Sequence, residues 1–122
     1  MIANVSPLAR ELRRHAEEKG PIRIGVAGAG QMGTDLCVQL ARMQGLRLAA
    51  IAELNIANAQ AALLLAGHAR EDFAEAKTAP DIDRLIELKK IAITGDLQAL
   101  VAAGRIDVVI DATGNPDTGA VF

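Results

Sequence analysis

A glycine-rich stretch at positions 22–33, IRIGVAGAGQMG, holds the residues whose types and spacing point most clearly to ligand binding. Its glycines have the spacing GxGxxG, which is typical of loops that bind the pyrophosphate of a dinucleotide. In such a loop Gly28 allows a sharp turn out of a strand, Gly30 lets the backbone approach the phosphates, and Gly33 lets a helix pack closely on the strand. The start of that helix adds free N–H groups and a positive dipole end. The stretch therefore predicts an anion-binding loop.

A carboxylate follows at the position where such a loop needs one. Residues 46–51 are predicted to form a second strand, and Glu53 lies just after it, 20 residues beyond Gly33. At that spacing a carboxylate meets the ribose hydroxyls of an adenosine. An isolated Glu is more often a solvated loop acid, but the strand, loop and helix before Glu53 favour the ribose role. A carboxylate there also repels a 2′-phosphate, which favours NAD; because Arg70 lies in a later insertion that can reach the site, we keep NAD(P).

A second candidate segment follows the last apolar run, where the sequence reads Thr113-Gly114-Asn115-Pro116. In open parallel sheets, ligands bind at the carboxyl ends of the strands where the strand order reverses. Thr113 and Asn115 can hydrogen-bond a ribose or an amide, and Gly114 permits close approach of the backbone. The alternative is a plain turn, because Gly-Asn-Pro is good turn chemistry. We predict that the segment contacts the cofactor.

The other reactive side chains do not form a catalytic set. Cys37 is the only cysteine, which excludes an internal disulfide, fits a cytoplasmic protein and favours a packing role. His15 and His68 are each isolated and are interpreted as surface residues. Asp111 and Asp117 flank the last loop, and a structural role is the better interpretation of Asp111. We assign no catalytic residue and no metal site.

Alternating strands and helices must position these residues, and they predict an α/β fold with a parallel, Rossmann-type sheet and helices on both faces. The expected strand order is 3-2-1-4. The predicted strands are residues 22–27, 46–51, 91–93 and 106–110, and we expect the last of them to be fully buried. The first predicted helix spans residues 31–43, and the second is capped by Asn55 and ends at Gly67. Two shorter helices are predicted to be capped by Asp81 and Asp96. Along the first helix, Met32, Leu36, Leu40 and Met43 are predicted to share one side. Residues 68–80 are predicted to be a polar elaboration.

Domain organisation follows from the same pattern. We expect residues 1–20 to form an N-terminal helical extension, with a helix over residues 6–19, and residues 21–122 to form the nucleotide-binding domain. With 122 residues the chain is one domain at most. The alternating pattern stops after four predicted strands, so we expect a sheet truncated before its second half.

Composition excludes some function classes. The net charge is −2 and the only aromatic residues are two phenylalanines, so the chain lacks the basic face and stacking rings of a nucleic-acid-binding protein. Its apolar runs are far below membrane-spanning length, and we expect no membrane contact.

Several segments together resemble homoserine dehydrogenase-like oxidoreductases: PIRIGVAGAGQMG, IELKKIAIT and GDLQALVAAGRIDVVIDATGNP. The nearest resemblance is to the subgroup with a C-terminal SAF domain, which includes deoxyxylulose-phosphate reductoisomerase-like enzymes. The resemblance implies a dinucleotide site with three parts. The pyrophosphate would be held by Gly28, Gly30, Gln31, Met32 and Gly33, and the adenosine ribose by Glu53. The nicotinamide side would be held by Thr113, Gly114 and Asn115. It also implies a catalytic domain beyond residue 122 that binds a small-molecule substrate and forms a homo-oligomer.

Two other functions remain open. A non-catalytic module that senses NAD(H) or binds a partner needs the same fingerprint, since fold does not fix function. A methyltransferase-like domain would use S-adenosylmethionine, but its glycine loop usually reads GxGxG. We expect the NAD(P)-binding domain of a hydride-transfer oxidoreductase.

Overall fold

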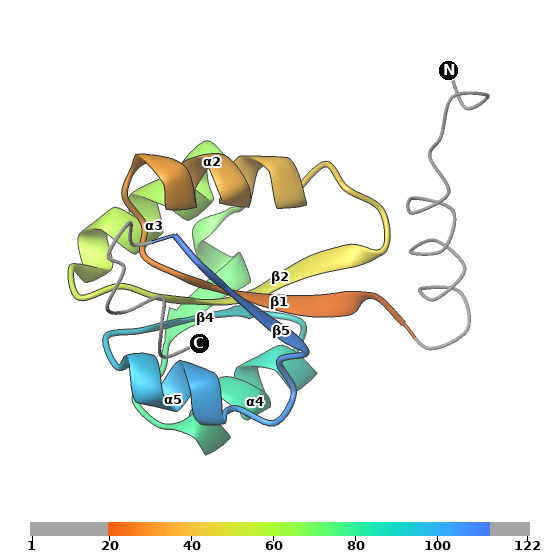
Figure 1. Ribbon diagram of the computed structural model, residues 1–122, viewed down its shortest axis with the longest axis vertical. Helices are drawn as coiled ribbons and strands as arrows, with labels where there is room; N and C mark the ends of the chain where they lie inside the picture. The colour runs from red at the N-terminus through yellow and green to blue at the C-terminus, as the bar shows by residue number, and fades with distance from the viewer. Residues whose placement is uncertain (1–19, 113–122) are drawn as a thin grey trace.

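A parallel β-sheet between two layers of helices forms the centre of the computed structural model, which describes residues 20–112 (Figure 1). The elements in chain order are β1 (Ile22–Ala27), α2 (Gln31–Leu40), β2 (Leu46–Ala52), α3 (Ile56–Leu65), a short 3-10 helix (Arg70–Asp72), β3 (Phe73–Glu75), α4 (Ala79–Glu87), β4 (Ile91–Thr94), α5 (Leu97–Ala102) and β5 (Val108–Asp111). The predicted α/β class with a parallel sheet is confirmed.

The strand order is β3-β4-β2-β1-β5, and the neighbouring strands pair in parallel. The predicted order of four strands is present as β4-β2-β1-β5, so β1 and β5 lie side by side where the winding reverses. The prediction missed β3, which pairs with the outer edge of β4. β3 is only three residues long, so it carries too few positions for an alternating pattern, and Phe73 is its single buried residue.

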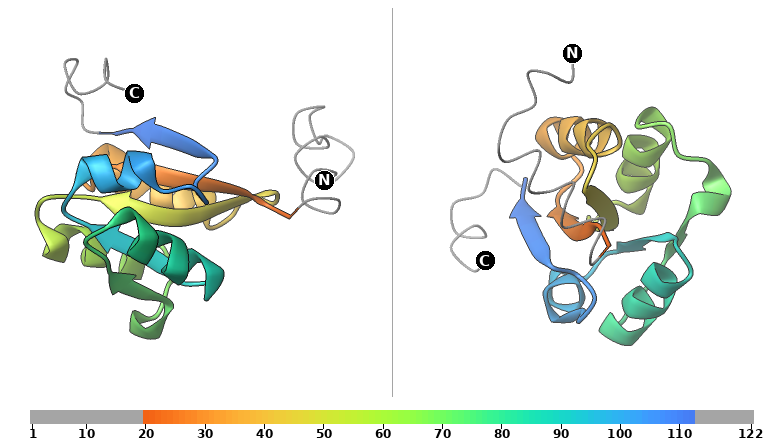
Figure 2. Two further views of the ribbon diagram at one scale, coloured as in Figure 1. Left: turned by 90° about the horizontal axis from the view of Figure 1, so that it is seen from below. Right: turned by 90° about the vertical axis from the view of Figure 1, so that its right-hand side faces the viewer.

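Helices cover both faces of the sheet, as predicted. Figures 1 and 2 show α2 and α3 on one face and α4 and α5 on the other. The first face buries larger aliphatic side chains, including Ile24, Val26 and Leu63. The second is rich in alanine, including Ala49 and Ala50, and lets its helices approach closely.

Of the three N-cap residues predicted within residues 20–112, two are confirmed. Asn55 Oδ1 accepts from the Ala57 N–H at 3.1 Å and Asp96 Oδ1 from the Gln98 N–H at 2.9 Å, so both predicted caps are confirmed. The prediction that Asp81 caps the next helix is wrong. Thr78 caps α4, and its Oγ1 accepts from the Asp81 N–H at 3.3 Å. A proline in the first turn is compatible with this earlier start, because that turn needs no helical N–H from it.

The buried residues of α2 are Gly33, Cys37 and Leu40, whereas Met32 is 58% exposed, because Gly33 is the residue that faces the sheet. The prediction of a fully buried last strand is wrong. The strand β5 is at the edge of the described sheet rather than fully buried, and its Val108 is 46% exposed. Several predictions lie outside the described residues. These are the helix over 6–19, the loop 113–116, His15 and Asp117, and all of the extension 1–20 except Gly20.

Candidate functional site

The glycine loop between β1 and α2 has the geometry that its spacing predicts. Gly28 adopts φ of 99°, a conformation that favours glycine, and its N–H donates to the Ala52 carbonyl at 2.7 Å. A Cβ on Gly33 would lie 2.1 Å from the Gly28 carbonyl oxygen, so only glycine lets α2 pack this closely on the loop. A Cβ on Gly30 would meet no atom within 4 Å. Open space therefore lies beside the glycine whose bare backbone would face a phosphate.

The first turn of α2 begins at Gly30, which serves as N-cap with no side-chain hydrogen bond to the helix. Gln31 and Met32 are exposed, so any ligand contact from this turn comes most directly from their backbone N–H groups. No acidic side chain lies in this turn to occupy the positive end of the dipole. The turn is therefore suited to an anion.

Glu53, directly after β2, is held in place by two backbone N–H groups. Its Oε1 accepts from the Ala29 N–H at 2.9 Å, and its Oε2 accepts from the Asn55 N–H at 3.2 Å. Ala29 is buried and belongs to the glycine loop, so the carboxylate ties this loop to the end of β2. Glu53 is half-buried rather than a solvated loop acid. A carboxylate can accept about four hydrogen bonds, so acceptor sites remain for a ligand.

A pocket of about 390 Å³ lies at the carboxyl ends of β1, β2 and β4. It is lined by Ala27, Gly28, Ala52, Glu53, Leu54, Gly95, Asp96 and Leu97. The structure thus brings Gly28 and Glu53 together, as the sequence predicted. Sequence reasoning missed Gly95 and Leu97 as site residues, because the segment was interpreted only as a helix cap. The signal available was their place after a strand that neighbours β2.

Other candidates lie away from this pocket or outside the description. Thr113, Gly114 and Asn115, and with them the predicted nicotinamide side, lie outside the described residues. Arg70 precedes β3 whereas Glu53 follows β2, so in a parallel sheet they lie at opposite ends, and the expected approach of Arg70 is not supported.

Two further reactive side chains also lie apart from the pocket. Burial raises the pKa of the Cys37 thiol to about 11, in keeping with a packing role. The Nε2 atom of His68 is buried and has no hydrogen-bond partner within the described part, which differs from the predicted surface histidine.

Comparisons with known proteins leave the site to be judged on its geometry. No protein-family model matches the chain, and no curated protein matches it. Across residues 20–112, no helix combines the length and apolar character needed to cross a membrane. Within the same range, no cluster of three or more His, Cys, Asp or Glu side chains is arranged to hold a metal ion.

Proposed function

We propose that this chain is the NAD(P)-binding domain of an oxidoreductase that carries out hydride transfer. The observation that carries the proposal is the bond between the Glu53 carboxylate and the Ala29 N–H, which joins the glycine loop to the predicted ribose acceptor. The open space at Gly30 and the uncapped first turn of α2 support a pyrophosphate beside that bond.

The 390 Å³ pocket suits the adenosine half of the dinucleotide. Its wall includes two leucines, of which Leu54 is 90% exposed, and a flat adenine ring packed on them would remove apolar surface from water. The ribose would then lie at Glu53, which has acceptor sites left for two hydroxyl groups. This arrangement uses the side chains that the structure already brings together.

NAD is the preferred cofactor in this proposal. A 2′-phosphate beside the Glu53 carboxylate would bring like charges together in a half-buried place. The cation that could offset this repulsion, Arg70, lies at the other end of the sheet. The nicotinamide and its hydride would be positioned by residues 113–115 and by a substrate domain, as the resemblance to homoserine dehydrogenase-like enzymes implies.

Calorimetric titration of the whole chain with NAD⁺, NADP⁺ and S-adenosylmethionine tests the proposal. We expect NAD⁺ to bind most tightly and S-adenosylmethionine not to bind. Gly30→Val should remove NAD⁺ binding, because its side chain fills the space beside the loop. Gly104→Val is the matched control: Gly104 is exposed, and an added Cβ would meet only Asp83 Oδ2, at 3.7 Å. Equal NAD⁺ affinity in both folded variants would refute a phosphate site at this loop.

A further inference from the structure

A second pocket, of about 360 Å³, lies at the amino end of the sheet, opposite the glycine loop. Four cationic side chains line it, together with a single acidic one: Arg23, Arg47, Lys89, Arg105 and Glu87. They come from β1, β2, the end of α4 and the segment before β5, so the tertiary structure alone gathers them. We name this group the cationic pocket.

Two of these cations are placed directly against each other. Arg23 in β1 and Arg47 in β2 are partners in the parallel register of the two strands. Like charges opposed across neighbouring strands destabilise a sheet. Burial lowers the pKa of the Arg47 guanidinium, and the nearby positive charge of Arg23 lowers it further. The free chain therefore keeps a half-buried arrangement that costs stability.

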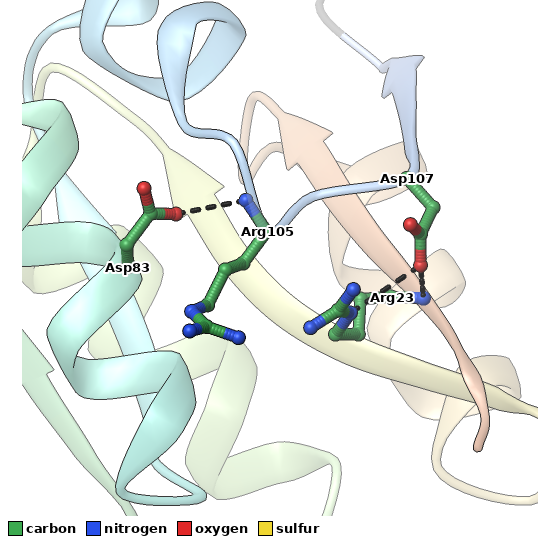
Figure 3. Close-up of polar contacts among 4 residues, drawn as sticks. All are labelled: Arg23, Asp83, Arg105 and Asp107. Carbon is green, nitrogen blue, oxygen red and sulfur yellow. Dashed lines mark hydrogen bonds and ion pairs between the residues drawn. The ribbon is translucent and has the colours of Figure 1, made fainter. Parts of the chain in front are cut away.

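Among the described residues, the carboxylates near the pocket pair with only two of its four cations. Arg23 pairs with Asp107 at 3.4 Å, and Arg105 pairs with Glu87. Asp83 bonds to the backbone: its carboxylate accepts from the N–H of Arg105 at 2.9 Å (Figure 3). It also accepts from the N–H of Gly104 at 3.2 Å. Within residues 20–112, neither Arg47 nor Lys89 has an ion-pair partner.

The geometry around Arg47 also leaves room for a ligand. Arg23, Arg47 and Arg105 all line this space, and Figure 3 shows the Arg23 side chain extending from its strand to the side on which Arg105 lies. Lys89 adds its ammonium from a backbone position with φ of 65°, where glycine is the usual residue after a helix. The lining is mainly polar, which favours a small charged ligand over an apolar or aromatic one.

We propose that the cationic pocket binds a small phosphate-bearing anion, at a site separate from the dinucleotide site. Guanidinium groups bind phosphate oxygens through paired, charge-assisted hydrogen bonds, and two or more of them converge here. An anion between Arg23 and Arg47 turns their repulsion into attraction toward a shared partner. The proposal does not depend on the proposed function, because the two sites lie at opposite ends of the sheet.

Inorganic pyrophosphate is the probe, and calorimetry with thermal unfolding of the whole chain is the measurement. Arg47→Gln should weaken pyrophosphate binding by roughly tenfold or more, the loss expected for a charge-assisted hydrogen bond. It should also raise the unfolding midpoint of the free chain, because the repulsion from Arg23 disappears, while removing the rise that pyrophosphate causes in wild type. A residue with a purely structural role would not combine a more stable free chain with a lost ligand effect.

Two variants locate the bound anion. Arg42→Gln removes one exposed arginine outside the pocket lining and should leave the affinity for pyrophosphate unchanged. Gly30→Val fills the glycine loop, where the proposed function also places a pyrophosphate group, so the pyrophosphate binding that this variant keeps, and that adding Arg47→Gln removes from it, belongs to the cationic pocket. The proposal is overturned if pyrophosphate does not bind, if Arg42→Gln weakens binding as much as Arg47→Gln, or if Gly30→Val abolishes binding that Arg47→Gln retains. The last result would place the anion at the glycine loop.

Discussion

Replacing Glu53 separates its effect on the glycine loop from its effect on the cofactor. Glu53→Ala leaves the buried Ala29 N–H without its acceptor at 2.9 Å. A buried donor without an acceptor destabilises the folded state by about 1–3 kcal/mol. The exposed Asn55 N–H can form a hydrogen bond with water instead, so its loss of Glu53 adds little to this destabilisation. We therefore expect Glu53→Ala to lower the free energy of unfolding by about 2 kcal/mol, measured by urea denaturation.

Glu53→Gln is the sharper variant for cofactor choice. Its amide oxygen can still accept from Ala29, while the amide nitrogen faces the Asn55 N–H, so we expect a smaller loss of about 1 kcal/mol in the unfolding free energy. Loss of the negative charge removes the repulsion of a 2′-phosphate. NAD⁺ should then bind more weakly, because each ribose hydrogen bond to a charged acceptor contributes about 1.5–3 kcal/mol, whereas NADP⁺ should bind equally well or better.

The quantity to compare is the ratio of the NADP⁺ and NAD⁺ dissociation constants, measured by calorimetry on folded protein. Glu75→Gln serves as the matched control, since Glu75 is an exposed acid that ends β3 and does not line the 390 Å³ pocket. The ratio should fall in Glu53→Gln and stay constant in Glu75→Gln. An unchanged ratio in a destabilised Glu53 variant would mean that the carboxylate only orders the loop, and the preference for NAD would lose its support.

Three further outcomes are expected from the packing of the described residues. Gly33→Ala should unfold at a markedly lower temperature than wild type, because its Cβ would lie 2.1 Å from a backbone oxygen, whereas Gly30→Ala should unfold near the wild-type temperature; equal midpoints would contradict this contrast. Cys37 should resist iodoacetamide at pH 8 in the folded chain and react once urea unfolds it. Because its pKa rises from 9.0 to about 11 on folding, the free energy of unfolding should fall as pH rises from 9 to 11, by at most about 2–3 kcal/mol. A Cys37→Ala variant should lack this pH dependence. Asp83→Ala should lower the free energy of unfolding by about 1 kcal/mol in urea denaturation, because two hydrogen bonds to its carboxylate are lost while the exposed N–H groups of Gly104 and Arg105 bond to water instead; exposed Glu71→Ala should lower it less.

The sequence by itself determined the features that depend on neighbours along the chain. The glycine spacing fixed the turn at Gly28 and the close packing at Gly33, because both follow from the absence of a Cβ. Asn55 and Asp96 were recognisable as helix caps, since a cap bonds an N–H two residues later. Alternating apolar runs were sufficient for the α/β class and for the order of the four longer strands.

Tertiary structure decided what depends on partners that are distant in sequence. Glu53 could be placed after a strand, but only the fold shows its carboxylate on Ala29, 24 positions earlier. The short β3 can be recognised as a strand only from its pairing with β4. The exposure of β5 follows from its place at the edge of the described sheet. The opposition of Arg23 and Arg47 is set by the register of two strands. No pattern within either segment encodes that register, because it arises from the packing of both strands against the helices.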